Sequence, residues 1–329
     1  VLAVLDHVWA QTRSGKVQSL LLQGEAGIGK SRVVHHFADR VSSGDGKVYE
    51  LRCFPETRHS ALYPVIQAMY KTIGRGSDDS SATLLKKLAS LLDDRAPQLT
   101  QRMLPWLAYM LSLPSDDLPP LPSLPPEHMS ATLHGVLAEL LLVSASLSPK
   151  LIVLEDAHWA DASTLAFIAL LCASPTQSAL CVLMTARPDS QAIQMKVRQL
   201  VLPPLSPQAM TGLIRAQRPD LSAQQLAHVM ARADGVPLFA IELLALNKLD
   251  ASKDITDLPL NLHDLLAVRL ETLGSERALA HWMACVGREI DEAMLEQLTD
   301  MTHAEFQTHV DRLLASDLFQ RLADGRLQD

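Results

Sequence analysis

The sequence predicts an α/β protein with a parallel sheet and helices on both faces of that sheet, followed by a helical segment and a winged-helix-like α domain. Two strand–helix–strand patterns occur before Pro203, and units of this kind build parallel sheets. A glycine-rich loop separates the first strand from its helix. After Pro203 and Pro204, strand-like runs vanish and short helices dominate.

The first strand–helix–strand unit occupies the N-terminal region. Residues 1–14 carry apolar side chains at helical spacing and lead to the apolar run 19–23, which predicts a buried strand. A helix with one apolar stripe follows the glycine-rich loop, and residues 48–53 form the next expected strand. Strand, helix and strand at this spacing indicate a parallel pair.

The second unit follows a long helical insertion. Residues 62–113 are helix-patterned, and the six prolines of the segment 114–126 then exclude regular structure, so we expect a surface loop there. A helix near residues 129–146 leads into the apolar strand 151–154. Another helix and the strand 180–185 complete the unit.

The C-terminal third has a different character. Short helices run to about Leu249, and the polar stretch 250–257 is typical of a linker. The remaining residues predict three or four short helices and a final strand, 318–321, with Gly325 in a turn. Helices followed by a small hairpin favour a winged helix.

Composition limits the function classes. The chain has 329 residues, 48% of them hydrophobic, which excludes wholesale disorder. Its formal net charge of −8, without a dense Lys/Arg run, argues against nucleic-acid binding by this chain alone. Four scattered cysteines form no CxxC pair, so we expect reduced thiols in a cytoplasmic protein. Apolar runs are short or carry charges such as Glu139 and Lys150, so no membrane segment is expected. The chain lacks an initiator Met, and we expect it to be part of a longer protein.

The glycine-rich loop carries the strongest functional signal. Its octamer Gly24-Glu25-Ala26-Gly27-Ile28-Gly29-Lys30-Ser31 fits the P-loop pattern G-x-x-x-x-G-K-[ST]. Glycines let backbone N–H groups converge on phosphate oxygens, and the helix N-terminus adds its positive end. We expect Lys30 to reach the β- and γ-phosphates of ATP and the Ser31 hydroxyl to bind Mg²⁺. The flanking strand and amphipathic helix are the context that a P-loop requires.

Two acids end the apolar strand 151–154. Glu155 and Asp156 lie where open α/β sheets place their ligands. One carboxylate is expected to hold Mg²⁺ and the other to polarise the attacking water, and the sequence does not decide between them. As the working assignment we take Glu155 as the Mg²⁺ partner, with Ser31, and Asp156 as the catalytic acid. The alternative is a pair of solvated charges.

Arg187 follows the strand 180–185. An arginine at this edge of the sheet is a candidate contact for the γ-phosphate, although arginines at strand ends are common and a purely structural role is the alternative. His158 and Trp159, directly after the two acids, are expected to pack rather than to act in catalysis.

With these motifs in place, the chain resembles the STAND class of AAA+-related P-loop ATPases, more narrowly the ATPase modules of large bacterial regulators associated with adenylate/guanylate cyclase, kinase or LuxR-type DNA-binding domains. The resemblance covers roughly residues 18–245. Its matching stretches are 24–32, 51–53, 60–66, 154–164, 185–188 and 234–239.

The resemblance implies a nucleotide site larger than the P-loop. Gly235-Val236-Pro237-Leu238 is similar to the GxP motif of a helical lid, in which Pro237 packs near the adenine; as a bare tetrapeptide it would be a helix-capping turn. Arg32 belongs to the matching P-loop stretch and is counted with the nucleotide-binding residues. Two features depart from the family: Glu155 stands where Asp is usual, and the Gly-Arg-Glu-like segment expected just before Val1 is not in this sequence.

Three domains are therefore expected. Residues 1–202 form the P-loop nucleotide-binding domain, with a helical, proline-rich insertion at about 74–130. Residues 203–258 form the helical lid and linker, and residues 259–329 the winged-helix-like domain.

The leading functional hypothesis is an ATP-binding, slowly hydrolysing signal-transduction switch with ATP or ADP and Mg²⁺ as its ligands. An output domain (cyclase, kinase or DNA-binding) in the full-length chain is the expected partner, and nucleotide-dependent self-association stays open. The alternatives are a P-loop kinase acting on a small acceptor and a scaffold that holds ADP without hydrolysis.

Overall fold

The computed structural model describes all residues except 77, 115–116, 176, 189–194, 250–261, 272, 287–288, 300, 316–318, 322–325 and 329. The chain divides into two compact units, Val1–Pro204 and Leu205–Asp329. Each unit is described here by itself.

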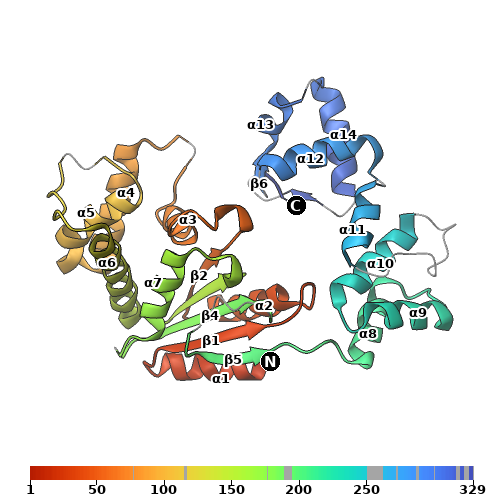
Figure 1. Cartoon of the computed structure of the whole chain (residues 1–329), viewed down its shortest axis with the longest axis horizontal. Coiled ribbons are helices and arrows are strands. Elements are labelled where there is room, and N and C mark those ends of the chain that lie inside the picture. Colours follow the sequence, from red (N-terminus) through yellow and green to blue (C-terminus); the bar gives the residue numbers. More distant parts are fainter. Residues whose placement is uncertain are drawn as a thin grey trace. The chain divides into compact units, whose positions relative to one another are not determined.

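The first unit is built on a five-stranded sheet with the order β2-β3-β4-β1-β5, whose neighbouring strands all run parallel (Figure 1). The carboxyl ends of all five strands therefore meet at one edge, where ligands bind in sheets of this kind. The strands are β1 (Gln18–Gln23), β2 (Lys47–Arg52), β3 (Lys150–Glu155), β4 (Leu180–Ala186) and β5 (Arg198–Val201).

Alternating side chains of the strands enter two separate cores, because successive residues of a strand point to opposite faces. Leu20 and Leu22 of β1 pack with the helices α1 (Leu2–Arg13) and α2 (Lys30–Ser42). Leu21, between them, belongs to the larger core on the other face. Both central strands, β3 and β4, are buried along their whole length, as expected for a sheet covered on both faces.

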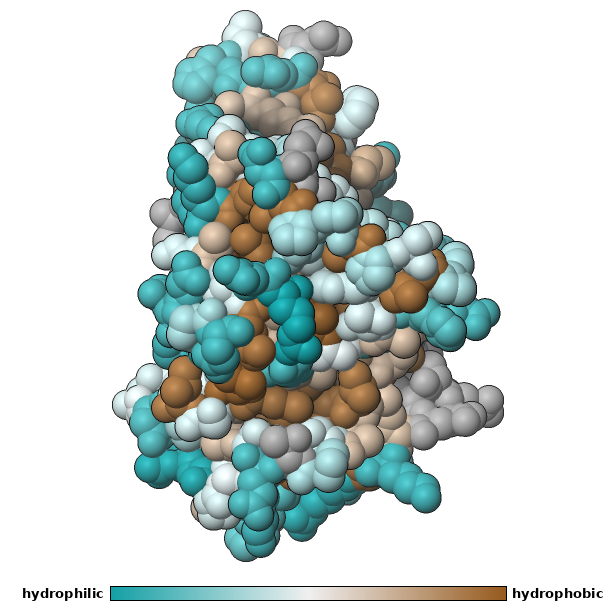
Figure 2. Space-filling view, turned by 90° about the vertical axis from the view of Figure 1, so that its left-hand side faces the viewer, coloured by the Kyte–Doolittle hydropathy of each residue, from teal (hydrophilic) through white to brown (hydrophobic). Residues whose placement is uncertain are grey.

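The larger core contains the helices of the insertion. Together with α7 they cover one face of the sheet. Figure 2 shows the molecule from the side on which α4, α5 and α6 lie in Figure 1. On this face, apolar patches alternate with polar side chains. The helices are α3 (Tyr63–Thr72), α4 (Ser81–Arg95), α5 (Thr100–Met110), α6 (Pro126–Leu147) and α7 (Ala162–Cys172).

The helix α6 is long and apolar enough, by length and composition, to cross a membrane. A core helix of a soluble protein passes the same test. Leu133, Val136, Leu137 and Leu140 of this helix are buried in the larger core, which accounts for its composition.

A buried carboxylate connects the segment before α3 to the start of α7. Asp161 Oδ1 accepts a hydrogen bond from the backbone N–H of Leu62 at 3.1 Å and from that of Thr164 at 2.9 Å, and thereby caps α7. Leu62 has a left-handed backbone conformation (φ 57°), which is unfavourable for a branched side chain and requires such support.

Asp161→Ala is therefore expected to destabilise the fold. The change removes a helix cap and leaves the buried Leu62 N–H without its acceptor, and together these losses cost about 2–4 kcal/mol. Urea unfolding followed by circular dichroism measures the change. Asp6→Ala, which removes only an exposed ion pair with Arg40, is the control and should change stability by less than about 1 kcal/mol. Equal midpoints for both variants would contradict the proposed role of Asp161.

The second unit begins with three helices around a small core, α8 (Pro207–Gln217), α9 (Ala223–Ala233) and α10 (Pro237–Leu249). It continues with α11 (Leu262–Glu271), α12 (Arg277–Val286), α13 (Glu292–Gln297) and α14 (His303–Ala315). A three-stranded antiparallel sheet of order β6-β8-β7 completes it, formed by β6 (Glu289–Asp291), β7 (Gln320–Arg321) and β8 (Arg326–Gln328).

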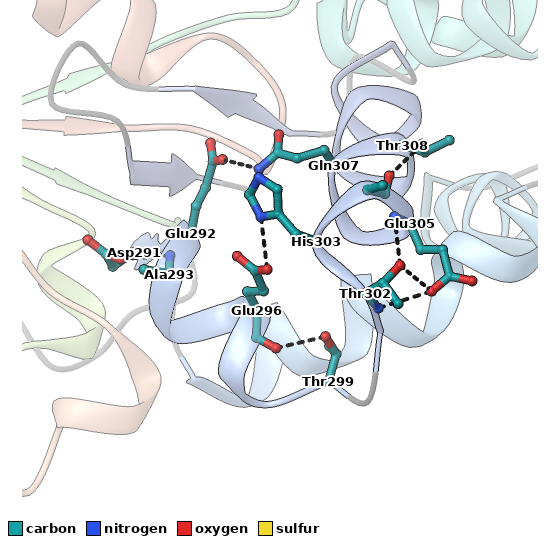
Figure 3. Close-up of polar contacts among 11 residues, drawn as sticks. Asp291, Glu292, Ala293, Glu296, Thr299, Thr302, His303, Glu305, Gln307 and Thr308 are labelled. Carbon is teal, nitrogen blue, oxygen red and sulfur yellow. Dashed lines mark hydrogen bonds and ion pairs between the residues drawn. The ribbon is translucent and has the colours of Figure 1, made fainter.

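Acidic side chains of this second unit are engaged within the unit itself. Glu296 lies 2.9 Å from Nδ1 of His303, and Glu292 contacts Gln307 of α14 and Arg321 of β7. Figure 3 shows Glu292 and Glu296 of α13 directed toward α14. These contacts join α13, α14 and the sheet.

Two strands were not expected from the sequence, β5 and β6. The expected helices are present, and the strand expected at 318–321 is described at Gln320–Arg321, as β7. Gly325 and the linker residues 250–257 lie outside the described residues. The three-domain boundaries stay a prediction.

Candidate functional site

The P-loop lies between β1 and α2, at the carboxyl edge of the sheet. Gly27 and Gly29 have positive φ angles of 74° and 101°, which only glycine adopts without strain. Gly29 is the N-cap of α2, and no side chain among the described residues caps this helix. The first N–H groups of α2 therefore point out of the helix, where they can bind an anion.

Lys30 is folded back over the loop. Its Nζ donates hydrogen bonds to the backbone oxygens of Gly24 at 2.8 Å and Glu25 at 2.9 Å, and the side chain is buried. Burial lowers the pKa of Lys30, and among the charges that act against this shift the effect of Asp156 is the largest. The ammonium is thus held over the loop, within electrostatic reach of a carboxylate.

Asp156 directly follows β3, and its charge acts on Lys30. Its backbone has an unusual left-handed conformation (φ 51°), and its N–H donates to Oγ1 of Thr185 at 2.9 Å. Thr185 belongs to β4, the strand between β3 and β1, so this bond fixes Asp156 at the carboxyl end of the strand that neighbours β1. Strained backbone of this kind is concentrated at functional sites.

Glu155, the last residue of β3, is buried and points toward α2. Its Oε1 lies 3.5 Å from Nε2 of His35. Burial raises the pKa of Glu155, and the nearby Arg52 and His35 partly offset this effect. Ser31 precedes His35 by four residues and lies on the same face of α2, so the Ser31 hydroxyl and the Glu155 carboxylate are directed to one side of the loop.

Arg187 follows β4 and is exposed. Its charge lowers the pKa of Lys30, secondarily to burial, and also acts on His158. The first unit therefore brings the P-loop, both acids and Arg187 to the same edge of the sheet. Arg32, in the first turn of α2, is exposed.

His158, for which the sequence favours a packing role, lies among the charged residues of the candidate site. Both of its ring nitrogens are buried and have no hydrogen-bond partner within the described structure. Burial lowers the pKa of His158, and the charges acting on its ring are those of Asp156, Arg187 and Lys30. The ring packs on Trp159 with a centroid distance of 5.1 Å, so packing, the role expected from sequence, is also present.

Pro237 belongs to the second unit, where it begins α10. Asp234 and Gly235 before it have left-handed conformations, with φ 45° and 76°, and form the turn between α9 and α10. Within this unit the motif acts as a helix-capping turn, and the adenine contact stays a prediction.

The residues at the sheet edge fit a nucleotide phosphate group with Mg²⁺. The α2 N-terminus and Lys30 supply positive groups, and the buried nitrogens of His158 lack partners. Ser31 and Glu155 carry oxygen atoms of the kind that Mg²⁺ prefers as ligands.

Comparisons with known proteins agree with this geometry. Residues 1–183 match the family model described as AAA ATPase domain. An uncharacterized protein from Rhizobium meliloti (strain 1021) is 22% identical over 312 residues, which are 90% of this chain and 30% of that protein. A solved Signal Transduction ATPase with Numerous Domains (STAND) protein with a tetratricopeptide repeat sensor, from Pyrococcus horikoshii, has a TM-score of 0.56 and 13% identity, covering 98% of this chain and 40% of that one. The chain thus spans less than half of either relative, and the structural likeness concerns the fold.

Proposed function

The chain belongs to the AAA ATPase domain family and has the α/β fold of P-loop NTPases, and on this premise we propose that it is the ATP-binding, slowly hydrolysing switch module of a larger regulatory protein. The proposal rests chiefly on one observation. Lys30 is held over the glycine loop beside the uncapped N-terminus of α2, within reach of the Asp156 carboxylate. Such a cradle binds the phosphates of a nucleoside triphosphate.

Each residue has a role in this proposal. Lys30 leaves the loop oxygens and binds the β- and γ-phosphates, while the α2 N-terminus binds their remaining oxygens. Mg²⁺, held by Ser31 and Glu155, would neutralise charge on the phosphates. Asp156 orients and polarises the attacking water, and Arg187 contacts the γ-phosphate. The contact of Pro237 with the adenine, and a change in lid orientation on hydrolysis, belong to the same proposal.

Two other functions use the same motifs. A kinase would transfer the γ-phosphate to a small acceptor and would need an acceptor pocket with a mobile, arginine-bearing lid. A scaffold would hold ADP and never turn over.

One experiment separates the three. Purified protein is analysed for bound nucleotide, and phosphate release from added ATP is measured with and without candidate acceptors. Phosphate release that is slow, Mg²⁺-dependent and independent of any acceptor supports the switch. Transfer that requires an acceptor supports the kinase, and tightly held ADP without release at any protein concentration supports the scaffold.

The larger context of the module is also part of the proposal. Because the chain spans 30% of its Rhizobium meliloti relative, we propose that the full protein carries further domains, including a cyclase, kinase or DNA-binding output. A cytoplasmic location and nucleotide-dependent self-association fit such a regulator.

The winged-helix-like region is expected to act as a switch element that does not bind DNA. Its acids Glu292 and Glu296 hold its own helices together, and no basic run provides the phosphate contacts that DNA requires. The measurement is an anisotropy titration of this protein with random duplex at low salt, and no saturation is expected up to micromolar protein. Tight binding that weakens as salt is added would make this region the output itself.

A further inference from the structure

A second pocket lies in the first unit, on the open side of the edge strand β2. It has a volume of about 500 Å³, within the range of small-molecule sites. Its walls are formed by the C-terminal half of α2, by β2 and by α3, with Arg95 from the end of α4. No residue of the P-loop lines this pocket, which we call the edge pocket.

Positively charged side chains line the edge pocket. Lys47, Lys71 and Arg95 line it, and none of the three has a carboxylate within 4.0 Å in the described structure. The acids in its wall are Asp39 and Glu50, and Glu50 lies 3.9 Å from Arg52. Three cations against two acids leave a net positive lining.

A fourth cation lies behind this wall. Lys150 is buried at the start of β3, next to Lys47 in the sheet register, and its Nζ donates to Oγ of Ser148. Burial, together with the charges of Lys47 and Arg95, lowers the pKa of Lys150 to about 8. The positive groups are therefore close enough to repel one another, and an anion would relieve that repulsion.

An apolar cavity adjoins the edge pocket. It has a volume of about 60 Å³ and lies among aliphatic side chains of β2, α3, α4 and α6, with Phe167 from α7. That is room for about four or more water-sized groups, since one needs roughly 10–15 Å³ on this measure. Four residues line both spaces: Tyr49, Ala68, Thr72 and Arg95.

Arg95 marks the boundary between the two spaces. Its Nη1 donates to the hydroxyl of Tyr49 at 2.8 Å, and its guanidinium carbon lies 5.9 Å from the centre of the same ring. This contact occupies one of its five N–H donors, so the guanidinium can also bind a carboxylate in a bidentate manner.

We propose that the edge pocket and the apolar cavity together bind a small organic anion with a short apolar tail, of the class of a six-carbon carboxylate. The carboxylate lies against Arg95, Lys47 and Lys71, and the tail passes Ala68 into the apolar cavity. Charge complementarity determines the head group, and the cavity volume limits the tail to about four to six carbons.

The test is a calorimetric titration of the whole chain with hexanoate. We expect saturable binding, at least tenfold weaker for acetate, which lacks the tail, and none for hexylamine, which carries the opposite charge. Arg95→Met keeps the stem and removes the charge, and Ala68→Phe fills the passage, so each should weaken hexanoate binding by tenfold or more. Arg75→Met is the matched control, because Arg75 also stacks on a tyrosine, at 4.4 Å from the Tyr70 ring, but lines neither space.

Thermal melting of each variant without ligand checks that it is folded. Absence of hexanoate binding to the folded wild-type chain would overturn the proposal, as would binding that neither Arg95→Met nor Ala68→Phe weakens. Binding of an extended acidic peptide but not of hexanoate would make the edge of β2 a strand-docking groove and would equally overturn it. ATP binding should persist in Arg95→Met, so this site can fail or succeed independently of the P-loop.

Discussion

Lys30→Ala is expected to weaken ATP binding by about tenfold or more, because the Lys30 ammonium is the mobile charge of the loop aimed at the β- and γ-phosphates. Its Nζ donates hydrogen bonds to the backbone oxygens of Gly24 and Glu25 in the loop, and no other bond of this group is found within the part of the chain that the structure describes. Removing the ammonium is therefore expected to destabilise the nucleotide complex more than the fold. Titration with a fluorescent ATP analogue in the presence of Mg²⁺ measures the loss.

The control for this variant is Lys16→Ala, which removes an exposed lysine ahead of β1 and leaves the loop unchanged. Lys16→Ala should bind the analogue like the wild type, and thermal melting without nucleotide should show that both variants are folded. If Lys30→Ala binds the analogue as tightly as the control, the P-loop is not the nucleotide site and the proposed function fails.

The strands β1, β3 and β4 could be predicted from the sequence because each has a recognisable sequence pattern. The strands β3 and β4 contain the apolar runs 151–154 and 180–184, and β1 stands directly before the glycine loop. The edge strand β5 carries no such signal. Three of its four residues, Arg198, Gln199 and Val201, are exposed, so no apolar run or alternation distinguishes it from a loop. Its pairing with β1 determines its structure.

In the candidate site, too, the sequence indicates some features and not others. The sequence predicts the P-loop and the two acids as site residues, since the chemistry of phosphate and Mg²⁺ requires these residue types at this spacing, and the structure places them at one edge of the sheet while their roles stay predictions. For His158 the sequence favours packing, because the two buried ring nitrogens without a partner in the described structure cannot be recognised from sequence. The bond from Leu62 to Asp161 is likewise invisible in the sequence, although it joins two of the stretches on which the family resemblance was based.

The two acids at the end of β3, Glu155 in the strand and Asp156 directly after it, have different surroundings, and this difference leads to the last prediction. Asp156 acts on Lys30 and His158, at the side of the site where the γ-phosphate and the attacking water would lie. Glu155 lies against His35, on the face of α2 that carries Ser31. We therefore expect Asp156→Asn to bind ATP almost normally but to hydrolyse it about 100-fold more slowly or worse, as on loss of a general base.

Glu155→Gln is the matched variant, since it makes the same carboxylate-to-amide change one residue earlier. Loss of a Mg²⁺ ligand should weaken ATP binding in the presence of Mg²⁺ and reduce hydrolysis along with it, while binding in the presence of EDTA should stay as in the wild type. Binding with and without Mg²⁺ and single-turnover hydrolysis are measured for both variants. The carboxylate that holds the metal affects ATP binding, whereas the one that polarises water affects only the rate of hydrolysis. If Glu155→Gln retains ATP and Asp156→Asn loses Mg²⁺-dependent binding, the two roles are therefore exchanged.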